Sequence, residues 1–225
     1  MLIGNSTQHG HNVSKIIIYK DNRPLSKINY NNAVFLLGAH TLAQCPPDQG
    51  VEVAFAGRSN VGKSSVLNAV TGNHRLARTS KTPGRTQQLN FFAVGAGQRL
   101  VDLPGYGYAR VPEKIKLHWA NVMQVYFETR ASLMGLMLIM DIRHPLKPYD
   151  EQMLEWCINA DLPVHVLLNK ADKLGRGAGI KTLQILKTRY RGGKFSAQLF
   201  SVLNEVGVEE ARRKLDEWLV FHGHV

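Results

Sequence analysis

Acidic residues and cysteines are scarce in this sequence, and long apolar runs are absent. Only 17 Asp and Glu stand against 28 Lys and Arg among 225 residues, so the formal net charge is +11. The two cysteines, Cys45 and Cys157, lie far apart without metal-ligand spacing. The apolar runs at 133–140 and 162–168 are about half of the roughly 20 residues that cross a bilayer, so we predict no membrane span. Residues 1–25 lack a secretory signal pattern, and a reducing cytoplasm is the expected location.

The composition is that of a folded protein with an anionic partner. Hydrophobic residues make up 44% of the chain and charged residues 20%, which excludes wholesale disorder and fibrous classes. The excess of positive charge predicts a negatively charged ligand or partner. Residues 1–30 are polar for the most part and are expected to form a flexible tail. We therefore predict one domain over residues 31–225, and we expect a monomer.

From residue 51 onward, strand-length apolar runs alternate with stretches of helical period. The predicted strands are Val51–Ala56, Leu89–Val94, Arg99–Asp102, Leu133–Asp141, Pro163–Asn169 and Gln198–Ser201. The predicted helices are Lys63–Thr71, Glu113–Thr129, Asp150–Ala160, Ile180–Tyr190 and Val208–Phe221, with an accessory helix over residues 33–43. This alternation predicts an α/β fold with a mostly parallel sheet of about six strands and helices on both faces. Ligands in such folds bind at the carboxyl ends of the strands.

The strand that begins at Val51 runs directly into a segment with the P-loop pattern. Two glycines frame four residues, and Lys63 and Ser64 follow. Glycines let successive backbone N–H groups face a phosphate, and the following helix adds its positive dipole end. Lys63 is expected to reach the β and γ phosphates, and Ser64 to bind Mg²⁺. The candidate phosphate-binding residues are Gly57, Arg58, Ser59, Asn60, Val61, Gly62, Lys63, Ser64 and Ser65.

A second candidate motif ends the strand at Asp102. Asp102, Leu103, Pro104 and Gly105 have the Asp-x-x-Gly spacing, which allows the carboxylate to hold Mg²⁺ through water and the glycine N–H to touch a γ-phosphate. Alone the spacing is weak, and a plain turn would be the favoured interpretation. Its position after a P-loop gives it weight.

A third motif ends the strand at 163–169 and predicts recognition of a guanine base. It is formed by Asn169, Lys170, Ala171 and Asp172. Guanine offers N1–H and its 2-amino group as a donor pair that the two oxygens of Asp172 can accept, whereas adenine lacks the pair. The stem of Lys170 can cover one face of the base, and Asn169 can tie this loop to the P-loop. An ATP-dependent kinase is disfavoured by the same carboxylate.

Together these residues resemble the GTPases of the TrmE-Era-EngA-EngB group, and most closely the EngB/YihA/YsxC ribosome-biogenesis GTPases. The resemblance covers about residues 31–221. It rests on residues 39–44, 53–65, 82–87, 102–109 and 141–144. It implies a Ras-like P-loop NTPase fold, GTP and GDP as ligands, Mg²⁺ as cofactor, a role in large ribosomal subunit assembly, and a requirement in cell division.

The resemblance also implies site residues that spacing alone does not. Residues 82–87 correspond to switch I, where Gly84 and Arg85 would contact nucleotide and Thr86 would be the second hydroxyl ligand of Mg²⁺. The implied metal ligands are thus Ser64, Thr86 and Asp102. The family's guanine loop corresponds to Phe200, Ser201 and Val202. The sequence Ser196-Ala197-Gln198 spells a Ras-like version of that loop, but it sits before rather than after the last predicted strand, so Ser201 is preferred.

Hydrolysis is expected to be slow. Ras-like enzymes orient water with a Gln after Asp-x-x-Gly, but Tyr106 stands there in this chain. Asn60 matches a P-loop Asn that helps related GTPases to hold K⁺, although it could merely cap the loop. Catalysis is assigned to Lys63, Asn60, Thr86 and Gly105, with intrinsic turnover on the order of 10⁻⁴ to 10⁻² s⁻¹ that K⁺ or a partner accelerates.

Positive charge is concentrated in two segments. Residues 53–101 contain seven Lys or Arg and no acid, and residues 173–204 contain another seven and none. Nucleotide phosphates account for part of the first surplus but not for the second, which includes Tyr190 and Phe195. Ribosomal RNA is the predicted counter-charge, and a solvated helix face is the alternative. A nucleotide-gated interaction protein of the septum with negligible turnover is the alternative function.

Overall fold

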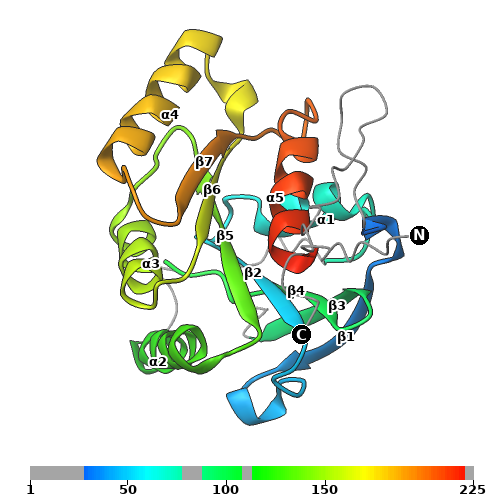
Figure 1. Cartoon of the computed structure of the whole chain (residues 1–225). Coiled ribbons are helices and arrows are strands. Elements are labelled where there is room, and N and C mark those ends of the chain that lie inside the picture. The colour runs from blue at the N-terminus through cyan, green and yellow to red at the C-terminus, as the bar shows by residue number, and fades with distance from the viewer. Residues whose placement is uncertain (1–27, 78–87, 108–112, 221–225) are drawn as a thin grey trace, which may run out of the picture.

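The computed structural model describes residues 28–77, 88–107 and 113–220, which form a three-layer α/β domain (Figure 1). The strands are β1 (Val34–Ala39), β2 (Val51–Gly57), β3 (Leu89–Gly95), β4 (Gln98–Asp102), β5 (Leu133–Asp141), β6 (Val164–Asn169) and β7 (Phe195–Leu199). The helices are α1 (Lys63–Thr71), α2 (Glu113–Thr129), α3 (Pro148–Asn159), α4 (Arg176–Arg189) and α5 (Val208–Val220). Short 3₁₀ turns are η1 (Tyr30–Asn32), η2 (Leu42–Gln44) and η3 (Ala171–Lys173).

The strands form one sheet in the order β1-β3-β4-β2-β5-β6-β7. From β4 to β7 every neighbouring pair is parallel, and only the pairs β1–β3 and β3–β4 are antiparallel. All carboxyl ends of the parallel strands therefore meet at one edge. This confirms the predicted α/β fold, with seven strands where about six were expected.

Helices cover both faces of the sheet. In Figure 1, α1 and α5 lie over one face, and α2, α3 and α4 lie over the other. The alternation along β2 explains this arrangement, because Val53 and Phe55 pack in the cluster with α1 and α5, whereas Ala54 and Ala56 face the opposite cluster. Every residue of β2 is buried, as a central parallel strand requires.

The accessory helix predicted over residues 33–43 is wrong. Residues 34–39 are β1, an edge strand that pairs antiparallel with β3, and Val34 is opposite Ala93. A short apolar run fits both a helical and an extended period, and the unpaired backbone groups of β3 decide between them. Ile28 and Tyr30 just before this strand are buried, and the Tyr30 hydroxyl donates to Asp216 at 2.8 Å.

The last strand begins earlier than predicted. β7 spans residues 195–199 rather than 198–201, because Ser196 and Gln198 on one face of the strand both contact the buried imidazole of His165 on β6, at 2.7 and 2.8 Å. Burial lowers the pKa of His165 to about 4, so this imidazole is neutral at pH 7. No helix within the described ranges is long and apolar enough to cross a membrane.

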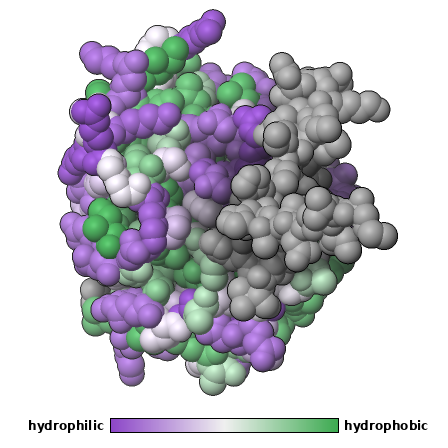
Figure 2. Space-filling view, in the orientation of Figure 1, coloured by the Kyte–Doolittle hydropathy of each residue, from purple (hydrophilic) through white to green (hydrophobic). Residues whose placement is uncertain are grey.

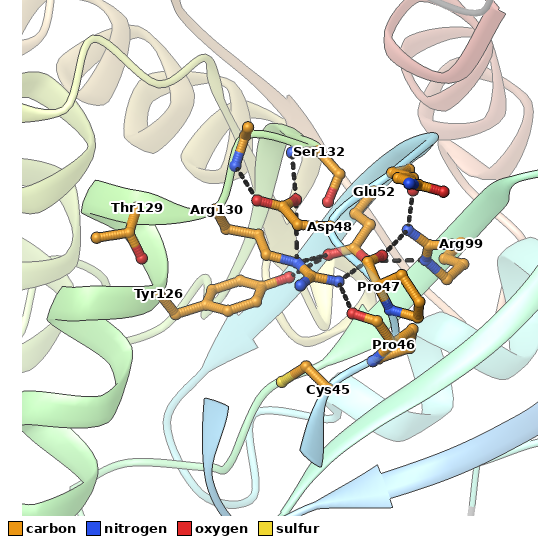
Figure 3. A network of polar contacts seen from close by, with 12 residues as sticks. Cys45, Pro46, Pro47, Asp48, Glu52, Arg99, Tyr126, Thr129, Arg130 and Ser132 are labelled. Carbon is orange, nitrogen blue, oxygen red and sulfur yellow. Dashed lines mark hydrogen bonds and ion pairs between the residues drawn. The ribbon is translucent and has the colours of Figure 1, made fainter. Parts of the chain in front are cut away.

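A buried polar network anchors the amino-terminal end of β2, far from the P-loop (Figure 3). The carboxylate of Glu52 has no exposed surface and accepts hydrogen bonds from Arg99 Nε at 2.7 Å, Tyr126 Oη at 2.9 Å and Arg130 Nη2 at 2.7 Å. Arg130 also donates to the Pro46 carbonyl, and Asp48 accepts the backbone N–H of Ser132. The network joins β2, β4 and α2 to the loop before β2.

We expect Glu52→Gln to destabilise the fold strongly. Both arginine side chains that it pairs with are about 10% exposed, so the substitution removes the charged partner of Arg99 and leaves Arg130 only its ion pair with Asp48 at 3.5 Å. The expected loss is about 3 kcal/mol of unfolding free energy, or a melting temperature roughly 6–12 °C lower. Urea denaturation and calorimetry measure both. Glu128→Gln on the exposed side of α2 is the control, and an equal effect of the two substitutions would contradict this account.

Candidate functional site

The P-loop lies between the end of β2 and the start of α1, at the carboxyl edge of the sheet. Gly62 is the N-cap of α1 and has a φ of 94°, which favours glycine. A Cβ on Gly62 would lie 2.7 Å from Asn169 Nδ2, and one on Gly57 would lie 2.8 Å from the carbonyl oxygen of Ile139. Both positions therefore require glycine, because a side chain would clash with these atoms. With glycine at the N-cap, the first backbone N–H groups of α1, which begins at Lys63, have no side-chain cap, as an anion site requires.

The P-loop lysine and the carboxylate of the second motif meet. Lys63 Nζ forms an ion pair with Asp102 Oδ1, and both side chains are nearly buried. Parallel pairing of β4 with β2 produces this contact, because Phe55 is opposite Asp102 and the N–H of Leu103 donates to the Phe55 carbonyl at 3.0 Å. Leu103 and Pro104 are buried, and Gly105 follows at the rim of the site.

The donors around this point fit Mg²⁺. Ser64 and Ser65, partly buried, open α1 beside Lys63, so a hydroxyl and the Asp102 carboxylate flank the helix terminus. Mg²⁺ prefers such hard oxygen ligands, usually one or two from the protein together with phosphate oxygens. Ser59 Oγ in the loop is buried without a hydrogen-bond partner among the described residues, which leaves a polar group available to a ligand. Gly84, Arg85 and Thr86 lie outside the described residues.

The third motif is tied directly to the P-loop. Asn169 Nδ2 donates to the Val61 carbonyl at 2.8 Å. Lys170, with a φ of 62°, reaches across the loop and donates from Nζ to the Asn60 carbonyl at 2.8 Å and to Asp141 Oδ2 at 3.0 Å. These contacts hold the ends of β2, β5 and β6 together. The Lys170 stem thus lies beside the loop, where it could cover a bound base.

The guanine motif meets the loop after β7. Asp172, in η3, accepts a hydrogen bond from Ser201 Oγ at 2.7 Å, and the Ala171 N–H donates to the Phe200 carbonyl at 3.0 Å. The Ser201 hydrogen bond lowers the pKa of Asp172, so its carboxylate is ionised at neutral pH and can accept from a base. Phe200 and Ser201 are buried, Val202 is half-buried, and Ser196 of the alternative loop lies inside β7, where it contacts His165.

Two carboxylates that sequence reasoning did not assign to the site lie directly behind it. Asp141 accepts from Lys170 and from Arg143, which donates from Nη2 at 2.7 Å, and these donors lower the pKa of Asp141. Asp150 is buried and accepts from Tyr106 Oη at 3.0 Å. In the sequence Asp150 is only an acid in the first turn of a predicted helix, and that signal does not separate it from an ordinary helix cap.

The fold and these three motifs at one edge of the sheet define a P-loop GTPase. A family model described as 50S ribosome-binding GTPase matches residues 52–170. The chain is 53% identical over 196 residues to a probable GTP-binding protein EngB of Nitrosococcus oceani, covering 86% of this chain and 98% of that one. It is 50% identical over 196 residues to a protein of the same description from Escherichia coli, covering 86% and 91%. The chain belongs to the EngB family of GTP-binding proteins, a family of GTPases.

Solved structures agree with the fold. The crystal structure of a probable GTP-binding protein engB aligns with a TM-score of 0.62 at 21% identity, covering 75% of this chain and 98% of that one. Era in complex with MgGDPNP and nucleotides 1506–1542 of 16S ribosomal RNA aligns with a TM-score of 0.60 at 19% identity, covering 76% of this chain and 57% of that one. These likenesses concern the architecture of the domain.

We expect Asn169→Ala to weaken GDP binding by roughly tenfold or more, because a small displacement of the guanine motif relative to the P-loop is costly. It also leaves the Val61 carbonyl without its donor, at a cost of about 1–3 kcal/mol in stability. Titration calorimetry and urea denaturation measure the two effects. Asn121→Ala on the exposed surface of α2 is the control. Wild-type GDP affinity in a folded Asn169→Ala variant would show that the tie has no part in binding.

Proposed function

We propose that this chain binds GTP and GDP with Mg²⁺ at this site, hydrolyses GTP slowly, and acts in the cytoplasm as a nucleotide-dependent switch in large ribosomal subunit assembly. The observation that carries the proposal is the bond from Asn169 to Val61, which ties the phosphate loop to the segment that contains Asp172. The Asp172 carboxylate can accept from the donor pair of guanine. Membership of the EngB family of GTP-binding proteins supports GTP and GDP as the ligands. The description of the matching family model supports the large subunit as partner.

Each end of the site has its own part in binding. The N–H groups from Gly62 to Ser65 and the ammonium of Lys63 would hold the phosphates, because the N–H groups of Ser59 and Val61 already donate to backbone carbonyls. Lys63 would exchange Asp102 for phosphate oxygens. Ser64, Thr86 and Asp102 would hold Mg²⁺, which when bound neutralises charge on the β and γ phosphates. Arg58 would contribute its backbone rather than its guanidinium, because that group is 3.3 Å from the buried carboxylate of Asp150.

Asp172 would select guanine, with Ser201 orienting its carboxylate. We expect Asp172→Asn to weaken GDP binding by about 1–3 kcal/mol, or roughly 5- to 150-fold, because one acceptor becomes a donor facing the guanine 2-amino group. Xanthosine diphosphate has a carbonyl in place of that amino group, so the variant should bind it more tightly than the wild type does. Competition against labelled GDP measures both affinities. Unchanged selectivity between the two nucleotides would contradict the assignment of Asp172.

Hydrolysis would rely on phosphate charge neutralisation by Lys63 and the loop amides, with Gly105 contacting the γ-phosphate. The residue that aligns with the Ras-like glutamine, Tyr106, is 7% exposed and donates its hydroxyl to Asp150. Its hydroxyl proton is therefore already used in a buried hydrogen bond, so Tyr106 would not orient water as the glutamine does. Asn60 is exposed beside the loop and remains our candidate for a K⁺ ligand. This arrangement supports our proposal of slow intrinsic turnover that K⁺ or a partner accelerates.

The second basic segment supports a ribosomal RNA partner. Among the described residues, Lys173, Arg189 and Lys194 form ion pairs with Asp172, Glu151 and Asp161. Within this segment, the exposed cations without an ion-pair partner among the described residues are Arg176, Lys181, Lys187 and Arg191. Most of them lie on α4, where Figure 2 shows hydrophilic side chains with hydrophobic ones among them. The related Era fold in complex with ribosomal RNA makes a GTPase of this architecture with an RNA partner reasonable.

We expect sedimentation with purified ribosomal subunits to show binding to the large subunit with a non-hydrolysable GTP analogue and little binding with GDP. Lys181→Ala combined with Lys187→Ala should weaken that binding and reduce its salt dependence, because two phosphate contacts are lost. Lys114→Ala, exposed on α2, is the control. Equal sedimentation with both nucleotides would contradict the proposed nucleotide-dependent switch. Negligible GTP turnover in the presence of subunits would favour the alternative, a nucleotide-gated protein of septum formation.

A further inference from the structure

We propose that Asp150 is a positioning residue that joins the P-loop to the segment after Gly105, and that this joint strengthens binding of the triphosphate and not of the diphosphate. The inference rests on nucleotide binding at the proposed site. It adds a residue of α3 that touches no nucleotide. Asp150 would act through two neighbours, Arg58 in the P-loop and Tyr106 in the second motif.

Three segments meet on one carboxylate. Asp150 Oδ1 accepts from Tyr106 Oη at 3.0 Å, and Oδ2 lies 3.3 Å from Arg58 Nε. Oδ2 also accepts the backbone N–H of Lys147 at 3.1 Å, which closes the first turn of α3. Arg58 Nη2 donates to the His144 carbonyl at 3.3 Å in the loop before α3. The carboxylate therefore links three parts of the chain that are distant in sequence.

Because Asp150 and Tyr106 are buried, breaking the hydrogen bond between them is costly. The Asp150 side chain has no exposed surface, and this burial raises its pKa, while Lys147, Tyr106 and Arg58 oppose the rise. Burial also raises the pKa of Tyr106 well above its usual value, so the phenol remains a donor at neutral pH. A buried acceptor that loses a donor is costly. If Tyr106 moved away from Arg58, the Asp150 carboxylate would lose one of these two partners, and this cost opposes the movement.

The backbones of the two partners are also paired. Arg58 and Tyr106 form a parallel bridge, and the Ser59 N–H donates to the Tyr106 carbonyl at 2.9 Å. Gly107, with a φ of 76°, lies against the Arg58 stem and the ring of Tyr149, because a Cβ there would be within 3.7 Å of both. The carboxylate fixes the side chains of two residues whose backbones already run side by side.

This arrangement matters most for the terminal phosphate. Ser59 follows Arg58 in the phosphate loop, and Gly105, the predicted γ-phosphate contact, precedes Tyr106. Asp150 thereby sets the position of Gly105 relative to the P-loop. A diphosphate would contact only the P-loop side, whereas a triphosphate would also contact Gly105. Loss of the joint should therefore weaken triphosphate binding and leave diphosphate binding nearly unchanged.

The test compares GDP with a non-hydrolysable GTP analogue in Tyr106→Phe, Asp150→Asn and the double variant, with calorimetric titration in Mg²⁺ buffer. In each single variant we expect GDP affinity to stay within about twofold and analogue affinity to fall about five- to tenfold. Because the two residues act through one contact, the double variant should lose little more than the larger single effect. The ratio of the two affinities is a readout that a merely structural role would not change.

Tyr126→Phe is the matched control. It removes the same kind of bond, from a buried tyrosine to the buried carboxylate of Glu52 at 2.9 Å, at the opposite end of β2. It should lower the melting temperature and leave the affinity ratio unchanged. If Asp150→Asn fails to fold, Tyr106→Phe decides. An unchanged ratio, equal weakening of both nucleotides, or additive effects in the double variant would overturn the inference. Failure of the wild type to bind either nucleotide would instead overturn the proposed function.

Discussion

One hydrogen bond, from the amide of Asn169 to the carbonyl of Val61, holds the two halves of the site together. The P-loop follows β2, whereas the guanine motif follows β6, with β5 between them in the sheet. Side chains that end parallel strands are brought to one edge by the sheet, but their relative positions within it depend on contacts such as this one. Lys170 adds a second link through Asn60 and Asp141.

The two ends of β2 differ in how their polar groups are paired. At its amino-terminal end, Glu52 is fully paired with two arginines and a tyrosine, which anchors β2, β4 and α2. At its carboxyl end, Gly62 and Ser59 leave backbone and hydroxyl groups available for a ligand. A fully hydrogen-bonded network thus anchors one end of β2, while the loop at the other end keeps polar groups that can bind a ligand.

Aromatic and acidic residues behind the site link its chemistry to the helical layer. The Tyr106 hydroxyl donates to Asp150, and Tyr149 lies near it at the start of α3, with the two ring centroids 6.2 Å apart. Tyr149 is 44% exposed. Movements of the segment after Gly105 would therefore reach the protein surface at α3, next to exposed Arg143 and His144.

The sequence by itself determined the α/β class, the bounds of α1 and α2, and the three motifs, because glycine spacing and apolar periodicity are local properties. It also selected Ser201 over Ser196 for the guanine loop, although it placed Ser201 at the end of the last strand and β7 ends at Leu199. It did not determine that residues 34–39 pair with β3, or that Asp150 lies behind the P-loop. A short apolar run suits either a helix or a strand, and an acid in a helix's first turn suits many roles. Only the tertiary structure decided these, because pairing partners and buried neighbours come from chain segments remote in sequence.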